Sequence, residues 1–71
     1  MPQTIRFRGY KVSGFAVKVD SGWWNAWYVI EKDDKFVRKW SLIIPIRSVA
    51  AAEAAALLHG AKAIEEWTID V

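Results

Sequence analysis

The sequence predicts one α+β domain, in which an antiparallel meander of three strands, or four, carries a C-terminal helix on one face. Two observations predict the elements. β-branched and aromatic residues fill residues 4–44 between short runs of turn residues, and an alanine-rich run with helical spacing follows Pro45. A third observation sets the domain count, because 71 residues without repeats or a linker suffice for a single domain, residues 1–71.

The first strand is expected over residues 4–19 as one long, bent segment. Its apolar residues change parity near Gly9 and again near Ser13-Gly14. Glycine tolerates a β-bulge, so we place irregularities at both points. A hairpin turn at Ser13-Gly14, which would make four strands, is the alternative.

The next two strands are expected over residues 23–32 and 36–44. A two-residue turn at Ser21-Gly22 would set Val17 opposite Ala26, and a three-residue turn at residues 33–35 would set Tyr28 opposite Trp40. Both registers keep apolar residues on one face. The side chains expected to face the helix are Phe15, Val17, Val19, Trp24, Ala26, Tyr28, Ile30, Phe36, Trp40, Leu42 and Ile44. Trp23 and Trp27 alternate with these and should face away.

The helix is expected over residues 49–67, with Ser48 as its N-cap. One stripe along it is apolar and small: Val49, Ala52, Ala56, Leu57, Gly60, Ala63, Ile64 and Trp67. Gly60 costs about 1 kcal/mol relative to alanine in a helix. We therefore expect a close approach between helix and sheet at Gly60.

Charge divides the chain into two parts. Residues 1–47 hold nine of the ten Lys and Arg residues but four of the eight acids, and the net charge of the whole chain is +2. The chain has no cysteine, no signal-peptide pattern at its N-terminus and no apolar run of the roughly 20 residues that span a bilayer. We expect a cytoplasmic protein with no membrane contact.

Catalytic chemistry is not expected. His59 is the only histidine, so histidine-based nucleophilic sites and multi-histidine metal sites would rest on one imidazole. The acidic pairs Asp33-Asp34 and Glu65-Glu66 fit a solvated turn and a helix surface. No phosphate loop or zinc signature is present. The sequence predicts neither an enzyme, a cofactor nor a small-molecule substrate.

The face of the sheet away from the helix is the predicted site. It would display cations among aromatic rings, and its candidate residues are Arg6, Arg8, Lys18, Trp23, Trp27 and Lys39. An apolar strip rimmed by charge favours contact with a protein partner or a second copy. Cations beside indoles equally fit nucleic acid, through phosphate neutralisation and base stacking. A solvated face with scattered apolar residues is the third interpretation.

Short motifs add a resemblance over roughly residues 5–66. They are Arg8-Gly9-Tyr10, Trp24-x-Ala26, Arg38-Lys39-Trp40 and Ile46-x-Ser48 before the alanine-rich helix. Their layout resembles DNA-binding domains with a three-stranded sheet and a helix, namely the plant ethylene-responsive type and the N-terminal arm-binding domains of phage integrases. The resemblance implies a sheet in the major groove, with Arg6, Arg8, Trp27 and Lys39 contacting DNA.

The chain departs from that family at the helix entry. Ile46-x-Ser48 stands where the family has Phe-x-Thr, and Ala50-Ala51 replaces an acidic pair. Together with Arg8-Gly9-Tyr10, the ending Trp67-x-Ile69-Asp70 is similar to small uncharacterised bacterial proteins with a sheet and a helix. The resemblances to phage integrase domains and to small bacterial proteins imply a bacterial or phage origin, and fold analogy alone does not carry function.

Overall fold

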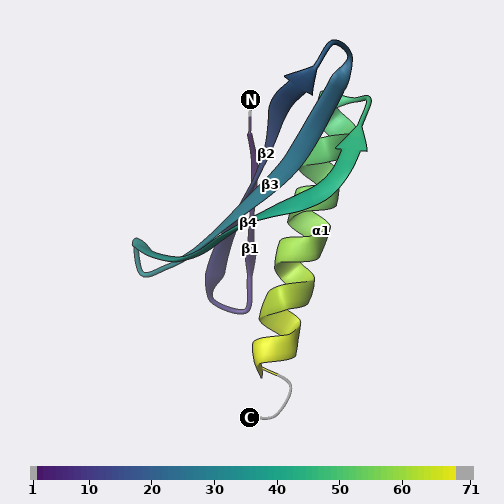
Figure 1. Cartoon of the computed structure of the whole chain (residues 1–71). Helices are drawn as coiled ribbons and strands as arrows, with labels where there is room; N and C mark the ends of the chain where they lie inside the picture. The colour runs from purple at the N-terminus through teal and green to yellow at the C-terminus, as the bar shows by residue number, and fades with distance from the viewer. Residues whose placement is uncertain (1, 69–71) are drawn as a thin grey trace.

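The structure, a computed structural model, describes residues 2–68 and contains four strands and one helix. The elements are β1 (Gln3–Phe7), β2 (Tyr10–Asp20), β3 (Trp23–Lys32), β4 (Lys35–Ile46) and α1 (Val49–Thr68). The strands form one antiparallel sheet in the order β1-β2-β3-β4, and α1 packs on one face (Figure 1). The predicted α+β fold is confirmed, with four strands. Ile69 and Asp70 lie outside the described residues.

A tight hairpin replaces the long, bent first strand, so that prediction is wrong. Arg8 and Gly9 have φ values of 51° and 86° and form a two-residue turn between β1 and β2. Such turns need positive φ at both positions, which glycine adopts without strain. The alternative turn at Ser13-Gly14 is also wrong, because Gly14 lies inside β2 opposite Tyr28. The parity change near Gly9 therefore marks a chain reversal.

The register between β2 and β3 differs by one residue from the predicted one. Ala16, and not Val17, stands opposite Ala26, and a bulge lies between Lys18 and Asp20. A one-residue shift moves every side chain to the other face of the sheet. Val17 consequently lies on the face away from α1, and Lys18 lies on the face that α1 covers.

Between β3 and β4 the predicted pairing of Tyr28 with Trp40 is confirmed. The turn that sets this pairing is nevertheless shorter than predicted. Lys32 pairs with Lys35 across Asp33 and Asp34, whose φ values are 52° and 62°. A bulge in β4 at residues 36–38 adds the residue that the shorter turn omits. Two local features thus give the register that a three-residue turn would have given.

Helix α1 begins where the sequence predicts. The backbone N–H of Ala51 donates to Ser48 Oγ at 3.2 Å, which confirms the N-cap. The buried helix residues are Ala52, Glu53, Ala56, Leu57, Gly60 and Ile64. Glu53 is buried beside β1, where Gln3 Nε2 donates to its Oε1 at 3.4 Å.

Glycine lets helix and sheet approach each other closely at two points. A Cβ built on Gly60 would lie 2.6 Å from Val12 Cγ1, and one built on Gly14 would lie 2.5 Å from the carbonyl oxygen of Glu53. Real Cβ atoms do not approach so closely. The close packing predicted at Gly60 is confirmed, and the core sits where α1 passes over β2 and β3.

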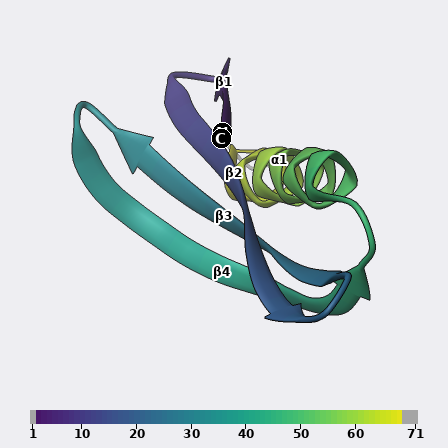
Figure 2. The ribbon, with the colours of Figure 1, turned by 90° about the horizontal axis from the view of Figure 1, so that it is seen from above.

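Strand β4 extends beyond the cover of the helix. Figure 2 shows α1 on the concave side of a curved sheet, with the β3–β4 hairpin projecting past it. Trp40 is 58 % exposed and Phe36 is 67 % exposed, and Ile44 is exposed as well. The prediction that these three side chains are covered by the helix is wrong. Helix α1 packs mainly on β2 and β3, which leaves Trp40 and Ile44 uncovered. The bulge at residues 36–38 places Phe36 opposite Glu31, on the face away from α1.

Candidate interaction surface

The face of the sheet away from α1 has an apolar centre. Phe15 of β2 lies opposite Trp27 of β3, and Val29 is the next residue of β3 on the same face. They border a hollow of about 410 Å³ lined by Phe15, Ala16, Val17, Trp27, Val29 and Lys39. We call this set the outer hollow. Among the described elements, none packs on this face of the sheet.

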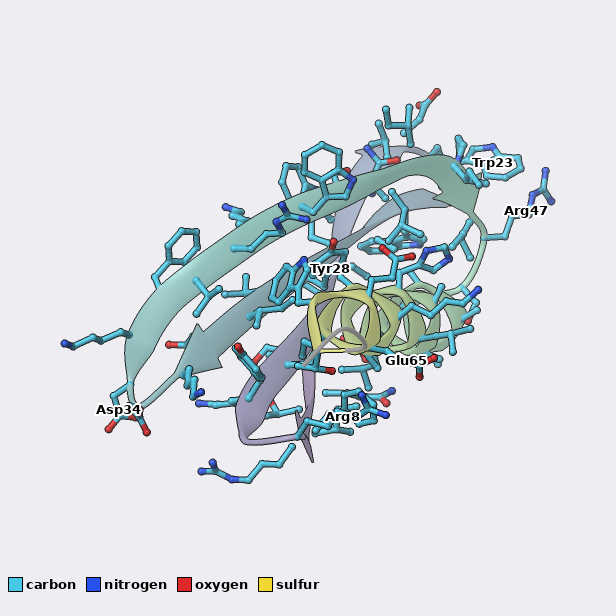
Figure 3. The ribbon with its side chains drawn as sticks, turned by 90° about the horizontal axis from the view of Figure 1, so that it is seen from below. Arg8, Trp23, Tyr28, Asp34, Arg47 and Glu65 are labelled. Carbon is cyan, nitrogen blue, oxygen red and sulfur yellow. The ribbon has the colours of Figure 1, made fainter. Side chains whose placement is uncertain are left out.

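Trp23 and Trp27 lie on the outer face as predicted, and each carries a cation over its ring. Lys39 Nζ lies 5.1 Å from the ring centroid of Trp27, and Arg47 Cζ lies 4.6 Å from that of Trp23. Figure 3 shows Trp23 and Arg47 at the end of the sheet opposite Asp34. Such pairs contribute about 0.5–1 kcal/mol each at exposed sites. The cations therefore cover part of the indole surface that a base would stack on.

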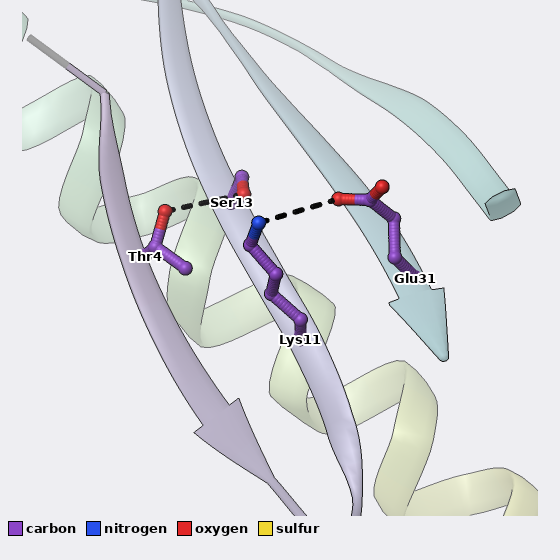
Figure 4. A network of polar contacts seen from close by, with 4 residues as sticks. All are labelled: Thr4, Lys11, Ser13 and Glu31. Carbon is purple, nitrogen blue, oxygen red and sulfur yellow. Dashed lines mark hydrogen bonds and ion pairs between the residues drawn. The ribbon is translucent and has the colours of Figure 1, made fainter. Parts of the chain in front are cut away.

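The outer face becomes polar toward β1. Lys11 Nζ lies 3.9 Å from Glu31 Oε1, and the hydroxyls of Thr4 and Ser13 are 3.2 Å apart (Figure 4). Arg6 pairs with Lys11 and shares this polar end. The predicted site residue Arg6 thus lies on the outer face, but two strands away from Trp27.

Arg8 does not belong to this face, and its predicted placement is corrected. Its Nη1 donates to Thr68 Oγ1 at 2.7 Å, and its guanidinium lies 5.2 Å from the Phe7 ring centroid. The two-residue turn directs Arg8 to the C-terminal end of α1 (Figure 3). A cation there interacts favourably with the helix dipole. This geometry gives Arg8 a structural role.

The prediction that Lys18 lies on the outer face is also wrong. It stands opposite Trp24, which packs against the core, so both share the face that α1 covers. Arg38 lies on that face too, with its guanidinium 5.1 Å from the Trp67 ring centroid. The cations of the sheet are therefore divided between its two faces, and Trp23, Trp27, Lys39 and Arg6 remain on the outer one.

Three residues of the outer face escaped sequence reasoning. Phe15 and Val17 were predicted to face the helix. The bulge before Asp20 turns them outward, and no residue in the sequence indicates this bulge. Arg47 follows β4 and reaches Trp23 only because the chain turns back toward α1. A positive charge two residues after Pro45 was the only available signal, and it is a weak one.

A second open surface lies between β4 and α1, on the helix side of the sheet. This hollow measures about 560 Å³ and is lined by Tyr28, Arg38, Trp40, Ser41, Leu42, Ile43, Ile44, His59, Lys62, Ala63 and Glu66. His59 is an exposed residue at its rim. The hollow exists because α1 leaves β4 uncovered.

Among residues 2–68, no group of three or more His, Cys, Asp or Glu side chains could hold a metal ion. Nor does α1, the helix of the described chain, have the apolar length needed to cross a membrane. Comparison of the chain with protein-family models, with curated proteins and with solved structures gives no match.

Proposed function

We propose that the chain is a small non-enzymatic binding or assembly domain that contacts a protein through the outer face of its sheet. The outer hollow supports this proposal best. A sheet buries its apolar face against another layer, and the outer hollow has no such layer within the described chain. Val17 at its rim is 49 % exposed. An aromatic and aliphatic centre with a charged rim is the usual anatomy of a protein interface.

Nucleic-acid binding through the same face is the second candidate. It is supported by four cations near the outer face, Arg6, Lys11, Lys39 and Arg47, of which Lys11 is paired with Glu31. Lys18 and Arg38 lie on the other face of the sheet, which lowers the positive charge available to phosphates. The rings of Trp23 and Trp27 are already in contact with cations, which weighs against base stacking. Protein contact is therefore the function that the surface supports better.

A matched pair of substitutions tests the proposal. Val17→Glu places a charge at the rim of the outer hollow, and Leu58→Glu places the same charge on α1, where Leu58 is 62 % exposed. Both proteins should fold. Proteins that co-purify with the wild type should be lost with Val17→Glu and retained with Leu58→Glu. Equal recovery with both variants would contradict a role of the outer face.

A salt titration decides between the two candidates. Binding of a random DNA duplex should weaken steeply with added salt if phosphates are neutralised. Lys39→Glu should then reduce binding at low salt, whereas Lys62→Glu on α1 should change it less. We expect no measurable binding at low salt, which would exclude the nucleic-acid candidate. Tight, salt-dependent binding would make it the preferred one.

A further inference from the structure

Strand β4 is an edge strand with an apolar sequence and exposed side chains. It pairs only with β3, so one side of its backbone has no partner strand within the described residues. Ile43 is 90 % exposed, and Trp40 and Phe36 are more than half exposed. A long edge strand with apolar side chains is a template for pairing with another strand. The opposite edge strand, β1, is less than half as long.

The backbone groups that face outward can be assigned by alternation. Hydrogen-bonded and non-hydrogen-bonded pairs alternate along each antiparallel ladder, and the tight β1–β2 turn closes with a hydrogen-bonded pair. When this alternation is followed from the β1–β2 turn through the pairs of β2 with β3 and of β3 with β4, the N–H and C=O groups of Trp40 and Leu42 point toward β3. The N–H and C=O groups of Lys39 and Ser41 therefore point away from the sheet.

We infer that two copies of the chain pair antiparallel through β4, about a two-fold axis at Trp40. Regular pairing of β4 runs over residues 38–42 between two bulges, and Trp40 is its centre. An axis at Trp40 pairs this whole segment with itself. Lys39 then lies opposite Ser41 of the second copy, which leaves its outward backbone groups hydrogen-bonded.

The neighbouring registers are less favourable. An axis at Lys39 sets Lys39 directly opposite Lys39 of the second copy, and like charges in that position are destabilising. An axis at Ser41 brings Ile43, within the second bulge, into the pairing. An axis midway between two residues would pair side chains that lie on opposite faces of the sheet, so the axis must pass through a residue. Trp40 is thus the favoured axis.

Pairing at Trp40 explains its exposure. At a non-hydrogen-bonded pair the side chains of opposite residues are closest, so the two indoles would cover each other on the helix side of the sheet. Lys39 lies over Trp27, which draws its ammonium away from the axis. The product is an eight-stranded sheet with a helix on each half. This inference concerns the β4 edge and does not depend on the proposed role of the outer face.

Sedimentation equilibrium tests the inference. A contact made by residues 38–42 of each copy should bury less than the roughly 1,200–2,000 Å² of standard interfaces, so we expect a dimer with a dissociation constant in about the micromolar range. A monomer at all concentrations up to about 1 mM would overturn the inference.

Variants of the edge make the test specific. Ser41→Pro removes a donor that faces away from β3, a position where an edge strand tolerates proline, and it should weaken the dimer at least about tenfold. Ser41→Thr should leave the dimer intact. Val17→Glu, on the outer face, should also leave it intact, so failure here and failure of the proposed function are distinguishable. Dimerisation lost with Val17→Glu and kept with Ser41→Pro would overturn the inference.

A single-cysteine experiment tests the register even if Ser41→Pro fails to fold. The chain has no cysteine, so each variant carries one thiol. Trp40→Cys sets two thiols opposite each other across the axis, within the separation that a disulfide requires. We expect it to oxidise to a covalent dimer faster than Phe36→Cys, although the side chain of Phe36 is the more exposed of the two. Equal rates would overturn an axis at Trp40.

Discussion

Gly60 of α1 and Val12 of β2 meet so closely that a Cβ on the glycine would lie 2.6 Å from Val12 Cγ1. Val12 is fully buried. This contact fixes how near the helix comes to the sheet, and it requires a glycine at a helical position where alanine has the higher propensity.

Gly60→Ala should therefore destabilise the fold. Overpacking against Val12 costs about 1–3 kcal/mol, which exceeds or offsets the gain of about 1 kcal/mol in helix propensity. Urea unfolding measures the change. When Val12 is already alanine, adding Gly60→Ala should destabilise less than it does in the wild type, because the smaller side chain makes room for the methyl group. A more stable Gly60→Ala protein would contradict the close packing.

Ser48→Ala should reduce stability by about 1 kcal/mol, because Ser48 Oγ accepts the Ala51 N–H at the start of α1. Ser48→Asp should retain most of the stability, since a carboxylate caps equally well and favours the helix N-terminus. Thermal unfolding followed by circular dichroism measures both. Ser21→Ala in the β2–β3 turn is the control and should change the midpoint little. An equal loss at both serines would argue against the cap.

Asp34→Gly should stabilise the protein by about 0.5–1 kcal/mol, because Asp34 has a φ of 62° and glycine adopts that conformation without a steric cost. Ser21→Gly is the matched control. Ser21 has no positive φ, so glycine there adds only unfolded-state entropy and should slightly destabilise. Denaturant unfolding should give opposite signs for the two variants. The same sign for both would count against a two-residue turn at Asp33-Asp34.

Arg8→Ala should lower stability by about 0.3–1 kcal/mol at low salt, through loss of its hydrogen bond to Thr68 and of its charge at the helix C-terminus. Arg6→Ala, on the outer face, should have a smaller effect on unfolding. The affinity for a partner bound at the outer face should instead fall more with Arg6→Ala than with Arg8→Ala. A partner lost with Arg8→Ala from a fully folded protein would return Arg8 to the binding site.

The sequence by itself determined β3, β4 and α1, and the alternation along β3. Helical spacing and the Ser48 cap are local patterns, so α1 was found to within a residue. Alternation in β3 likewise placed Trp23 and Trp27 on the outer face, because successive strand residues must point to opposite sides.

Only the tertiary structure decided which residues share a face on β2 and β4. A single bulged residue reverses the facing of everything beyond it, and such bulges lie before Asp20 in β2 and near Val37 in β4. That is why Lys18 moved to the helix side and Val17 to the outer face. The exposure of Trp40 has a different tertiary cause, because α1 lies over β2 and β3 and leaves the edge strand β4 open.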